Sequence, residues 1–334
     1  MQKKYIAFGL GGIIGAAVAW KFLRRPSTVY FEEYADLISN SQYSKFVDID
    51  GLELHYQEFG KEADPTIILI HGYTASTYVW RDVAPIFAAA GFRVIAVDLI
   101  GYGYSEKPKW FDYTIASQAR IIGRLMNRLG IGNATLIGSS YGGAVAAWYA
   151  LDNPERVEKL VLVDAVTNDD PKKMAILRLA NLPGVGELLT PFMADSKTFM
   201  KIRMKGTFDS NNRHLVTDDR VESSIRPLRA ADGHNSILTT SRNWHAARIE
   251  NDAYLIEQPT LLIWGENDKV IPLSNGERLY DDMLNSRLVI FKNCGHLPPE
   301  ELPRLFTEVV IEFLNEPTGK IAAKDESELK LKQV

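Results

Sequence analysis

The chain is poor in the residues that build disulfide frameworks and metal sites. It has one cysteine, Cys294, in 334 residues, which excludes an internal disulfide and any cysteine-rich metal centre. No His-x-x-x-His pair or carboxylate cluster indicates a metal, and no G-x-G-x-x-G fingerprint follows an expected strand. We therefore expect no metal and no cofactor, and we interpret Cys294 as a small buried packing residue.

Basic blocks and internal repeats are also missing. The net charge is −4, and no basic run with interleaved aromatic residues occurs, so a nucleic-acid partner is not expected. An apolar content of 46% over 334 residues suffices for one large domain with an additional segment. Such a chain buries about three-quarters of its unfolded surface.

The longest uncharged apolar run lies at the amino terminus, at residues 5–20, with basic residues on both sides. Continued to residue 23, it would form a helix of about 28 Å, close to the roughly 30 Å of a bilayer core. We predict that residues 5–23 are an uncleaved membrane anchor of undetermined orientation. Residues 17–19, Ala-Val-Ala, resemble a signal-peptidase site, so a cleaved signal and a secreted or periplasmic protein form the alternative. An interfacial or soluble helix is the third interpretation.

Strands and helices alternate along the rest of the chain. Residues 46–56 alternate apolar and polar side chains around a turn, as an antiparallel edge hairpin does. Helical spacing is found at residues 79–90 and 115–129. The predicted fold class is therefore α/β, with a mostly parallel sheet and helices on both faces. The buried parallel strands are expected where short β-branched and apolar runs occur, at residues 66–70, 93–97, 134–137, 157–163, 259–264 and 287–291.

The same pattern divides the chain into segments. An insertion at residues 167–245 lacks β-branched runs but has helix-like apolar spacing and four of the seven methionines. Most of its apolar side chains are expected to form its own core, and some to line a lipophilic entrance. The predicted segments are the anchor (1–25), a linker (26–44), the α/β core (45–166 and 246–315), the insertion (167–245) and a charged, flexible tail (316–334).

A G-x-S-x-G motif interrupts this pattern at residues 138–142, directly after one expected strand and before a helix-like stretch. This is the nucleophile elbow, a sharp strand-to-helix turn that exposes its central serine. The register selects Ser140, because Ser139 has Ile137 rather than glycine two places before it. Ser140 is therefore the predicted nucleophile.

Two partners for such a serine follow in the chain. A serine hydroxyl needs an imidazole to accept its proton, and the imidazole needs a carboxylate to fix its tautomer. Asp268 follows the expected strand at 259–264, and His296 lies in the loop after the strand at 287–291. Asp164 also ends a strand and remains a rival for the role of the acid, although we favour Asp268. All these residues lie beyond the carboxyl ends of strands, where sites form in such sheets.

The order Ser, Asp, His resembles that of the α/β-hydrolase superfamily. The His71-Gly72 pair after a strand and the segment 98–105 extend the resemblance over residues 45–315. It implies a helical cap for the insertion and an oxyanion hole made by the backbone N–H groups of Tyr73 and Tyr141. It also implies that His71 shapes its loop, and that Asp98 ties down a turn.

The resemblance implies a serine hydrolase that cleaves carboxylic esters through an acyl-enzyme. The apolar amino terminus followed by this domain is similar to membrane-anchored monoacylglycerol lipases, so the expected partner is a small apolar ester. One alternative is a carbon–carbon bond hydrolase of the meta-cleavage-product type, which has a similar triad. A second alternative is a non-catalytic ligand-binding protein of the same fold. The sequence does not indicate an oligomeric state.

Overall fold

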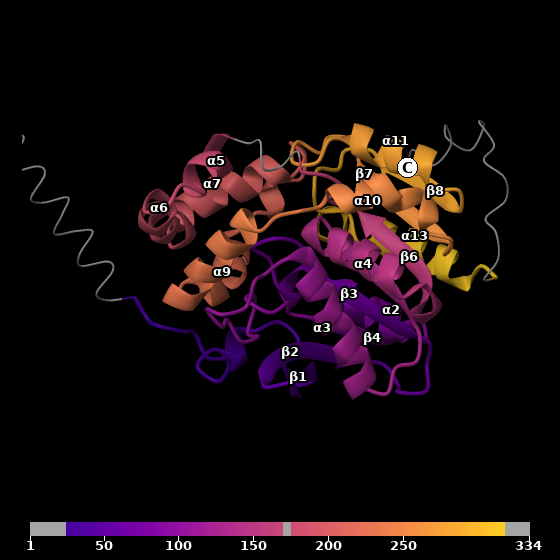
Figure 1. The fold of residues 1–334 in the computed structure, drawn as a ribbon, viewed down its shortest axis with the longest axis horizontal. Helices are drawn as coiled ribbons and strands as arrows, with labels where there is room; N and C mark the ends of the chain where they lie inside the picture. The colour runs from indigo at the N-terminus through magenta and orange to yellow at the C-terminus, as the bar shows by residue number, and fades with distance from the viewer. Residues whose placement is uncertain (1–24, 170–174, 318–334) are drawn as a thin grey trace, which may run out of the picture.

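The computed structural model describes residues 25–169 and 175–317, and these form an eight-stranded sheet in the order β1-β2-β4-β3-β5-β6-β7-β8 (Figure 1). β2 is antiparallel to its neighbours β1 and β4, and all other pairs are parallel. The predicted α/β class is thus confirmed. The strands are β1 (Ser44–Ile49), β2 (Leu52–Phe59), β3 (Thr66–Ile70), β4 (Arg93–Val97), β5 (Ala134–Ser139), β6 (Val157–Val163), β7 (Thr260–Gly265) and β8 (Ser286–Phe291).

Helices cover both faces of the sheet. Alternate side chains of a strand point to opposite faces, and β3 shows this directly. Ile68 and Ile70 join one apolar cluster with α3, α4, α10 and α11, whereas Ile67 and Leu69 join another with α2 and α13. The helices are α2 (Ala84–Ala89), α3 (Ile115–Arg128), α4 (Tyr141–Asp152), α10 (Ala247–Asp252), α11 (Leu273–Asp282), α12 (Pro298–Glu301) and α13 (Pro303–Asn315).

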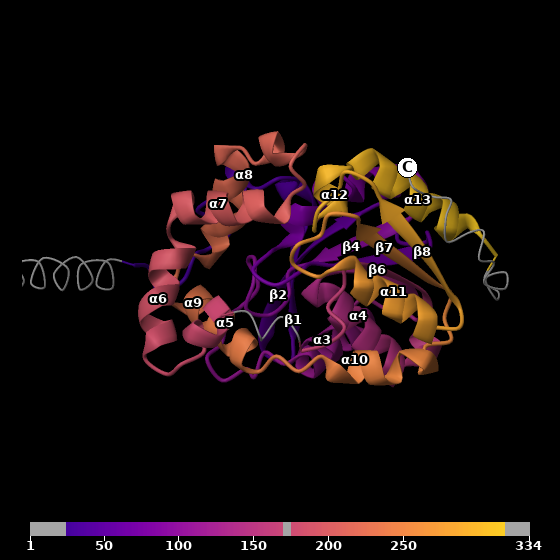
Figure 2. The same cartoon turned by 90° about the horizontal axis from the view of Figure 1, so that it is seen from above.

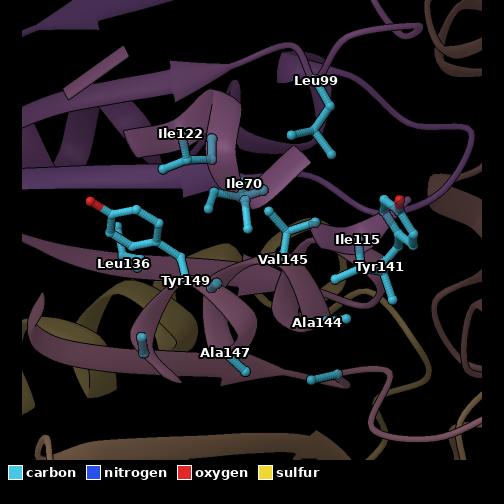
Figure 3. Packing of buried hydrophobic residues seen from close by; sticks show 14 of the residues in the cluster. Ile70, Leu99, Ile115, Ile122, Leu136, Tyr141, Ala144, Val145, Ala147 and Tyr149 are labelled. Carbon is cyan, nitrogen blue, oxygen red and sulfur yellow. The ribbon is translucent and has the colours of Figure 1, made fainter. Parts of the chain in front are cut away.

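The first of these clusters lies beneath the serine elbow. Figure 3 shows Ile122 of α3 and Val145 of α4 gathered around Ile70 of β3, with Leu136 of β5 nearby. All four side chains are inaccessible to solvent or nearly so. Burying one such side chain contributes about 1.5–3 kcal/mol, so this packing fixes the position of α4 and with it the turn that precedes the helix.

The helix expected over residues 79–90 is shorter than its spacing suggested. The chain forms a 3₁₀ turn at Thr77–Trp80, and α2 occupies only Ala84–Ala89. Pro85 explains the difference, because proline is tolerated in the first turn of a helix but not in its interior. The helix therefore has to start next to Pro85.

Between β6 and α10 the insertion forms helices that lie together at one end of the molecule (Figure 2). Leu188 and Ile202 of these helices are exposed, at 45% and 67%. Leu179 is also exposed, at 49%. Six other apolar side chains form a small core of the insertion's own: Met200, Met204, Phe208, Val216, Val221 and Ile225. The helices are α5 (Ala175–Ala180), α6 (Val185–Ala194), α7 (Lys197–Thr207), α8 (Asp218–Ile225) and α9 (Ala231–Arg242).

The ends of the described chain are attached to this body. The Ala231 and Asp232 N–H groups, at the start of α9, donate to the carbonyls of Pro26 and Ser27 at 3.0 and 3.1 Å. Glu316, which the sequence assigned to the tail, pairs with Arg287 at 2.7 Å.

The predicted anchor at residues 5–23 and the tail from residue 318 onward lie outside the described residues. Among the helices that are described, none combines the length and the apolar character needed to cross a bilayer.

Replacing Gly142 with alanine should destabilise the fold strongly. A Cβ atom there would lie 2.2 Å from the Ile70 carbonyl oxygen and 2.4 Å from that of His71, so backbone has to move. We expect a loss of about 3 kcal/mol or more in the free energy of unfolding, measured by denaturant titration. Gly206→Ala is the control, because nothing lies within 4 Å of its Cβ position inside α7. This variant should gain up to about 1 kcal/mol, and equal stability of the two variants would contradict the prediction.

Candidate active site

Ser140 occupies the turn between β5 and α4 in a strained conformation, with φ 53° and ψ −117°. Its N–H donates to the Val163 carbonyl at 2.9 Å, and its own carbonyl accepts from Val166 N at 3.0 Å. Gly72 lets the neighbouring loop approach closely, since a Cβ atom there would lie 3.1 Å from Ser140 Cβ. The serine is therefore held rigidly at the carboxyl end of the sheet.

Backbone strain is concentrated at this edge of the sheet. Seven non-glycine residues of the described chain have positive φ, and four of them follow parallel strands: Thr74, Ser140, Asp164 and Asn293. Such conformations cost about 1–3 kcal/mol each and collect where a site needs them. The carboxyl ends of β3, β5, β6 and β8 thus carry the features of one shared site.

His296 and Asp268 form a buried pair at this edge. His296 Nδ1 lies 2.7 Å from Asp268 Oδ2, so the ring donates a hydrogen bond from Nδ1. In the neutral ring, Nε2 then carries no hydrogen and can accept a proton. The other carboxylate oxygen, Oδ1, accepts from Val270 N at 2.7 Å and from Ile271 N at 3.1 Å. The acid loop therefore fixes the carboxylate, and the carboxylate fixes the tautomer and orientation of the ring.

The serine and the histidine make no hydrogen bond to each other. Within the described residues, no hydrogen bond joins the Ser140 hydroxyl to the His296 ring. A carboxyl oxygen of Asp164, which follows the Val163 carbonyl that holds Ser140, lies within 4.8 Å of a His296 nitrogen. Catalytic hydrogen bonds are often long in ligand-free proteins and shorten when substrate binds. His296 and the elbow thus lie at the same edge of the sheet, linked through Asp164.

The rival acid, Asp164, has a different environment. It is fully buried; its Oδ1 accepts from Gly265 N at 2.9 Å, and its Oδ2 has no hydrogen-bond partner among the described residues. Burial, in the first place, and the negative charge of Asp268 raise the pKa of Asp164 well above its usual value. The structure therefore places Asp268, and not Asp164, in direct contact with the histidine.

Two backbone N–H groups face the site without an internal acceptor. Neither Tyr73 N nor Tyr141 N donates a hydrogen bond within the described residues. The Tyr73 hydroxyl donates to the Ile237 carbonyl at 2.9 Å, and the Tyr141 hydroxyl donates to that of Tyr113 at 3.1 Å. The side chains are thus used in packing, while the two N–H groups remain available to an oxyanion.

The family model of the α/β-hydrolase fold matches residues 65–303, on the segment that carries every part of this site. The chain belongs to the α/β-hydrolase fold family. A 2-hydroxy-6-oxononadienedioate/2-hydroxy-6-oxononatrienedioate hydrolase of Burkholderia vietnamiensis (strain G4) is 30% identical over 300 residues. That match covers 83% of this chain and 97% of the relative. The protein is accordingly a hydrolase.

Solved structures agree with this assignment. The meta-cleavage product hydrolase CumD of Pseudomonas fluorescens IP01, a mutant complexed with acetates, has a TM-score of 0.67 and 28% identity. It covers 83% of this chain, and 99% of its own length is matched. A membrane phospholipase A, described as a bacterial virulence factor, has a TM-score of 0.68 and 26% identity, with 92% of this chain and 98% of that one covered.

Two residues near the site of this α/β hydrolase are structural. His71 Nδ1 donates to the Gly72 carbonyl at 2.8 Å, and Nε2 accepts from Leu99 N at 3.1 Å. Burial lowers the pKa of His71, so the ring is neutral and both nitrogens are occupied. Asp98 accepts from Thr77 N at 2.6 Å and so ties the loop after β4 to the one after β3.

Sequence reasoning missed the partner of Asp98. His55 of β2 is fully buried, with Nδ1 2.6 Å from Asp98 Oδ2. Burial alone would raise the pKa of Asp98, but the nearby His55 holds it below its usual value. In the alternation of β2, His55 falls on the polar side with Glu53 and Gln57, so no local signal indicated its burial.

The insertion of the hydrolase is attached to the loops that carry Asp268 and His296. The His296 N–H donates to the carbonyl of Thr207, at the end of α7, at 2.8 Å. Asp209, two residues later, accepts from the Asn267 amide at 2.9 Å. Buried Glu301 accepts from Gly295 N at 3.0 Å and from Asp209 N at 2.8 Å. Glu301 and Asp209 therefore fix the acid and histidine loops, a role that no sequence motif indicated.

The carboxylates and the imidazole could in principle also hold a cation. The ligand atoms of Asp164, Asp268 and His296 all lie within 4.8 Å of one another. However, a cation would have to break the Nδ1–Oδ2 hydrogen bond of 2.7 Å, and a carboxyl group with a raised pKa is a poor ligand at neutral pH. The contacts that are present fit a proton relay better than a metal site.

Proposed function

We propose that this hydrolase cleaves carboxylic esters with Ser140 as nucleophile, His296 as general base and Asp268 as the orienting acid. The observation that carries the proposal is the 2.7 Å contact between His296 Nδ1 and Asp268 Oδ2, made beside a serine in the strained elbow conformation. A fixed imidazole that can reach a serine hydroxyl is the arrangement that activates serine for acyl transfer.

In the proposed reaction, Ser140 Oγ attacks the ester carbonyl carbon while His296 Nε2 takes the hydroxyl proton. The oxyanion of the tetrahedral intermediate accepts hydrogen bonds from Tyr73 N and Tyr141 N. Loss of one such donor lowers kcat by about 10²- to 10³-fold. The imidazolium then protonates the departing alcohol, leaving an acyl-enzyme. A water molecule, deprotonated by the same imidazole, releases the acid and restores Ser140.

An ester that is apolar is favoured by two observations. The match to the membrane phospholipase A covers 92% of this chain, more than the 83% covered by CumD. The exposed Leu179, Leu188 and Ile202 on the helices of the insertion give it apolar surface. Attachment to a membrane through residues 5–23 remains part of this proposal, based on the sequence of that segment alone.

Hydrolysis of a carbon–carbon bond is the second candidate. It is favoured by the 28% identity with CumD, which is named a meta-cleavage product hydrolase. The 30% identity with the 2-hydroxy-6-oxononadienedioate hydrolase of Burkholderia vietnamiensis also favours it. The same serine, histidine and aspartate would serve in either reaction, so the distinction lies in the substrate that is bound.

A direct comparison of substrates tests the proposal. Purified protein is assayed on 4-nitrophenyl esters and monoacylglycerols of several chain lengths. It is also assayed on 2-hydroxy-6-oxononadienedioate, the compound in the name of the Burkholderia relative. We expect kcat/KM to favour an ester by at least about tenfold, or roughly 1.4 kcal/mol in transition-state binding. A preference for the dienedioate would replace the esterase proposal with the second candidate.

A further inference from the structure

A second acid lies buried beside the proposed relay, and the proposed mechanism does not use it. Asp164 follows β6 with a left-handed backbone, φ 44°, which a non-glycine residue adopts only under constraint. Titratable groups face it from three other elements. They are Asp268 after β7, His296 and Cys294 after β8, and Glu301 of α12.

Two carboxyl groups this close cannot both be charged in a buried site, so the pair retains one proton. The hydrogen bonds decide which group keeps it. Asp268 receives three N–H donors, from Val270 N, Ile271 N and His296 Nδ1. Asp164 receives one, from Gly265 N, and its Oδ2 receives none within the described residues. Because hydrogen-bond donors stabilise an ionised carboxylate, the negative charge belongs on Asp268. The shared proton then belongs on Asp164 Oδ2.

We propose that Asp164 is a positioning residue that stays a neutral carboxylic acid, with its Oδ2 proton directed at the Asp268 carboxylate. The two side chains carry a single negative charge between them, and Asp164 helps to hold the Asp268 carboxylate toward His296. The catalytic part of this inference rests on the proposed function, whereas the protonation state of Asp164 does not.

Two substitutions separate the proton from the shape of the side chain. Asp164→Asn keeps a neutral donor of the same size, so we expect kcat/KM to fall by less than about tenfold. Asp164→Leu removes the donor, so we expect a larger fall, of about 100-fold. With Leu, Asp268 keeps more of its charge for the imidazolium, and the acidic limb of the pH–rate profile should move to higher pH.

The protonation state has a readout that needs no activity. A carboxyl group whose pKa is raised on folding stabilises the native state below its unfolded pKa, about 3.9, and loses that contribution as pH rises through the folded value. Asparagine does not titrate. The Tm of the wild type should therefore fall relative to that of Asp164→Asn as the pH is raised above about 4.

The outcomes are distinct. A loss of about 10³-fold or more in Asp164→Asn would make Asp164 the charged acid and overturn the inference. So would equal activities and pH profiles for the Asn and Leu variants, or a Tm difference that does not change with pH. If the wild type hydrolyses no substrate and reacts with no fluorophosphonate, the proposed function fails. In that case the Tm comparison still decides whether Asp164 is protonated.

Discussion

Ser140→Ala should lower kcat by about 10⁵- to 10⁶-fold, the scale of loss when a triad nucleophile is removed. In the proposed mechanism, this substitution leaves the covalent step without its nucleophile. Binding and the two oxyanion donors stay intact, so a small residual rate over water is expected. The measurement is steady-state hydrolysis of the best ester, together with covalent labelling by a fluorophosphonate probe.

The adjacent serine provides a matched control. Ser139 is 1% exposed, and its hydroxyl has no hydrogen-bond partner among the described residues. Ser139→Ala should therefore be labelled like the wild type and retain its turnover. Equal labelling of Ser140→Ala and wild type would show that the probe reacts elsewhere, and loss of labelling in Ser139→Ala would mean that the register of the motif was read wrongly.

Short sequence patterns predicted the structure correctly where a single physical requirement determines the local conformation. The strands at residues 66–70, 93–97 and 157–163 occur as expected, because a run that is apolar on both faces fits only a sheet covered on both sides. The elbow was recognisable for a similar reason. One of its glycines is required by a contact within the motif, since a Cβ atom on Gly138 would lie 2.3 Å from the Gly142 carbonyl oxygen.

Contacts between distant segments were not predictable in this way. Asp164 and Asp268 both follow strands, and the sequence alone could not exclude either as the acid of the relay. The choice depends on the path of the loop after β8, which brings His296 to within 2.7 Å of Asp268. That path is fixed by Glu301 of α12, close to His296 in the chain, and by Thr207 of α7. The second contact comes from a distant segment, which no local pattern indicates.

Helical spacing also did not show which apolar side chains of the insertion would be buried. Met200 and Ile202 belong to the same apolar pattern in α7, yet Met200 is buried in the small core of the insertion and Ile202 is 67% exposed. The pattern marks residues that favour burial, but it does not show whether another segment is there to cover them.

Asp268→Asn should lower kcat by about 10⁴-fold, the scale of loss when an amide replaces the orienting carboxylate. The amide NH₂ cannot accept from His296 Nδ1 and would instead favour the tautomer with its proton on Nε2, which cannot deprotonate Ser140. If the amide oxygen turns to the ring, its NH₂ group faces Val270 N and Ile271 N, which now donate to Oδ1 at 2.7 and 3.1 Å. Either orientation leaves donors opposed, so the loss does not depend on which one is adopted.

Glu266→Gln makes the same chemical change at an exposed position of the same loop and should stay within about 0.5 kcal/mol of wild-type stability with unchanged turnover. The thermal unfolding of both variants separates a catalytic loss from a folding defect. Activity in Asp268→Asn above about a tenth of wild type would mean that another carboxylate orients His296. Asp164, within 4.8 Å of the ring nitrogen, is the group that would have to do so, and the double variant Asp164→Asn/Asp268→Asn would then lose the remaining rate.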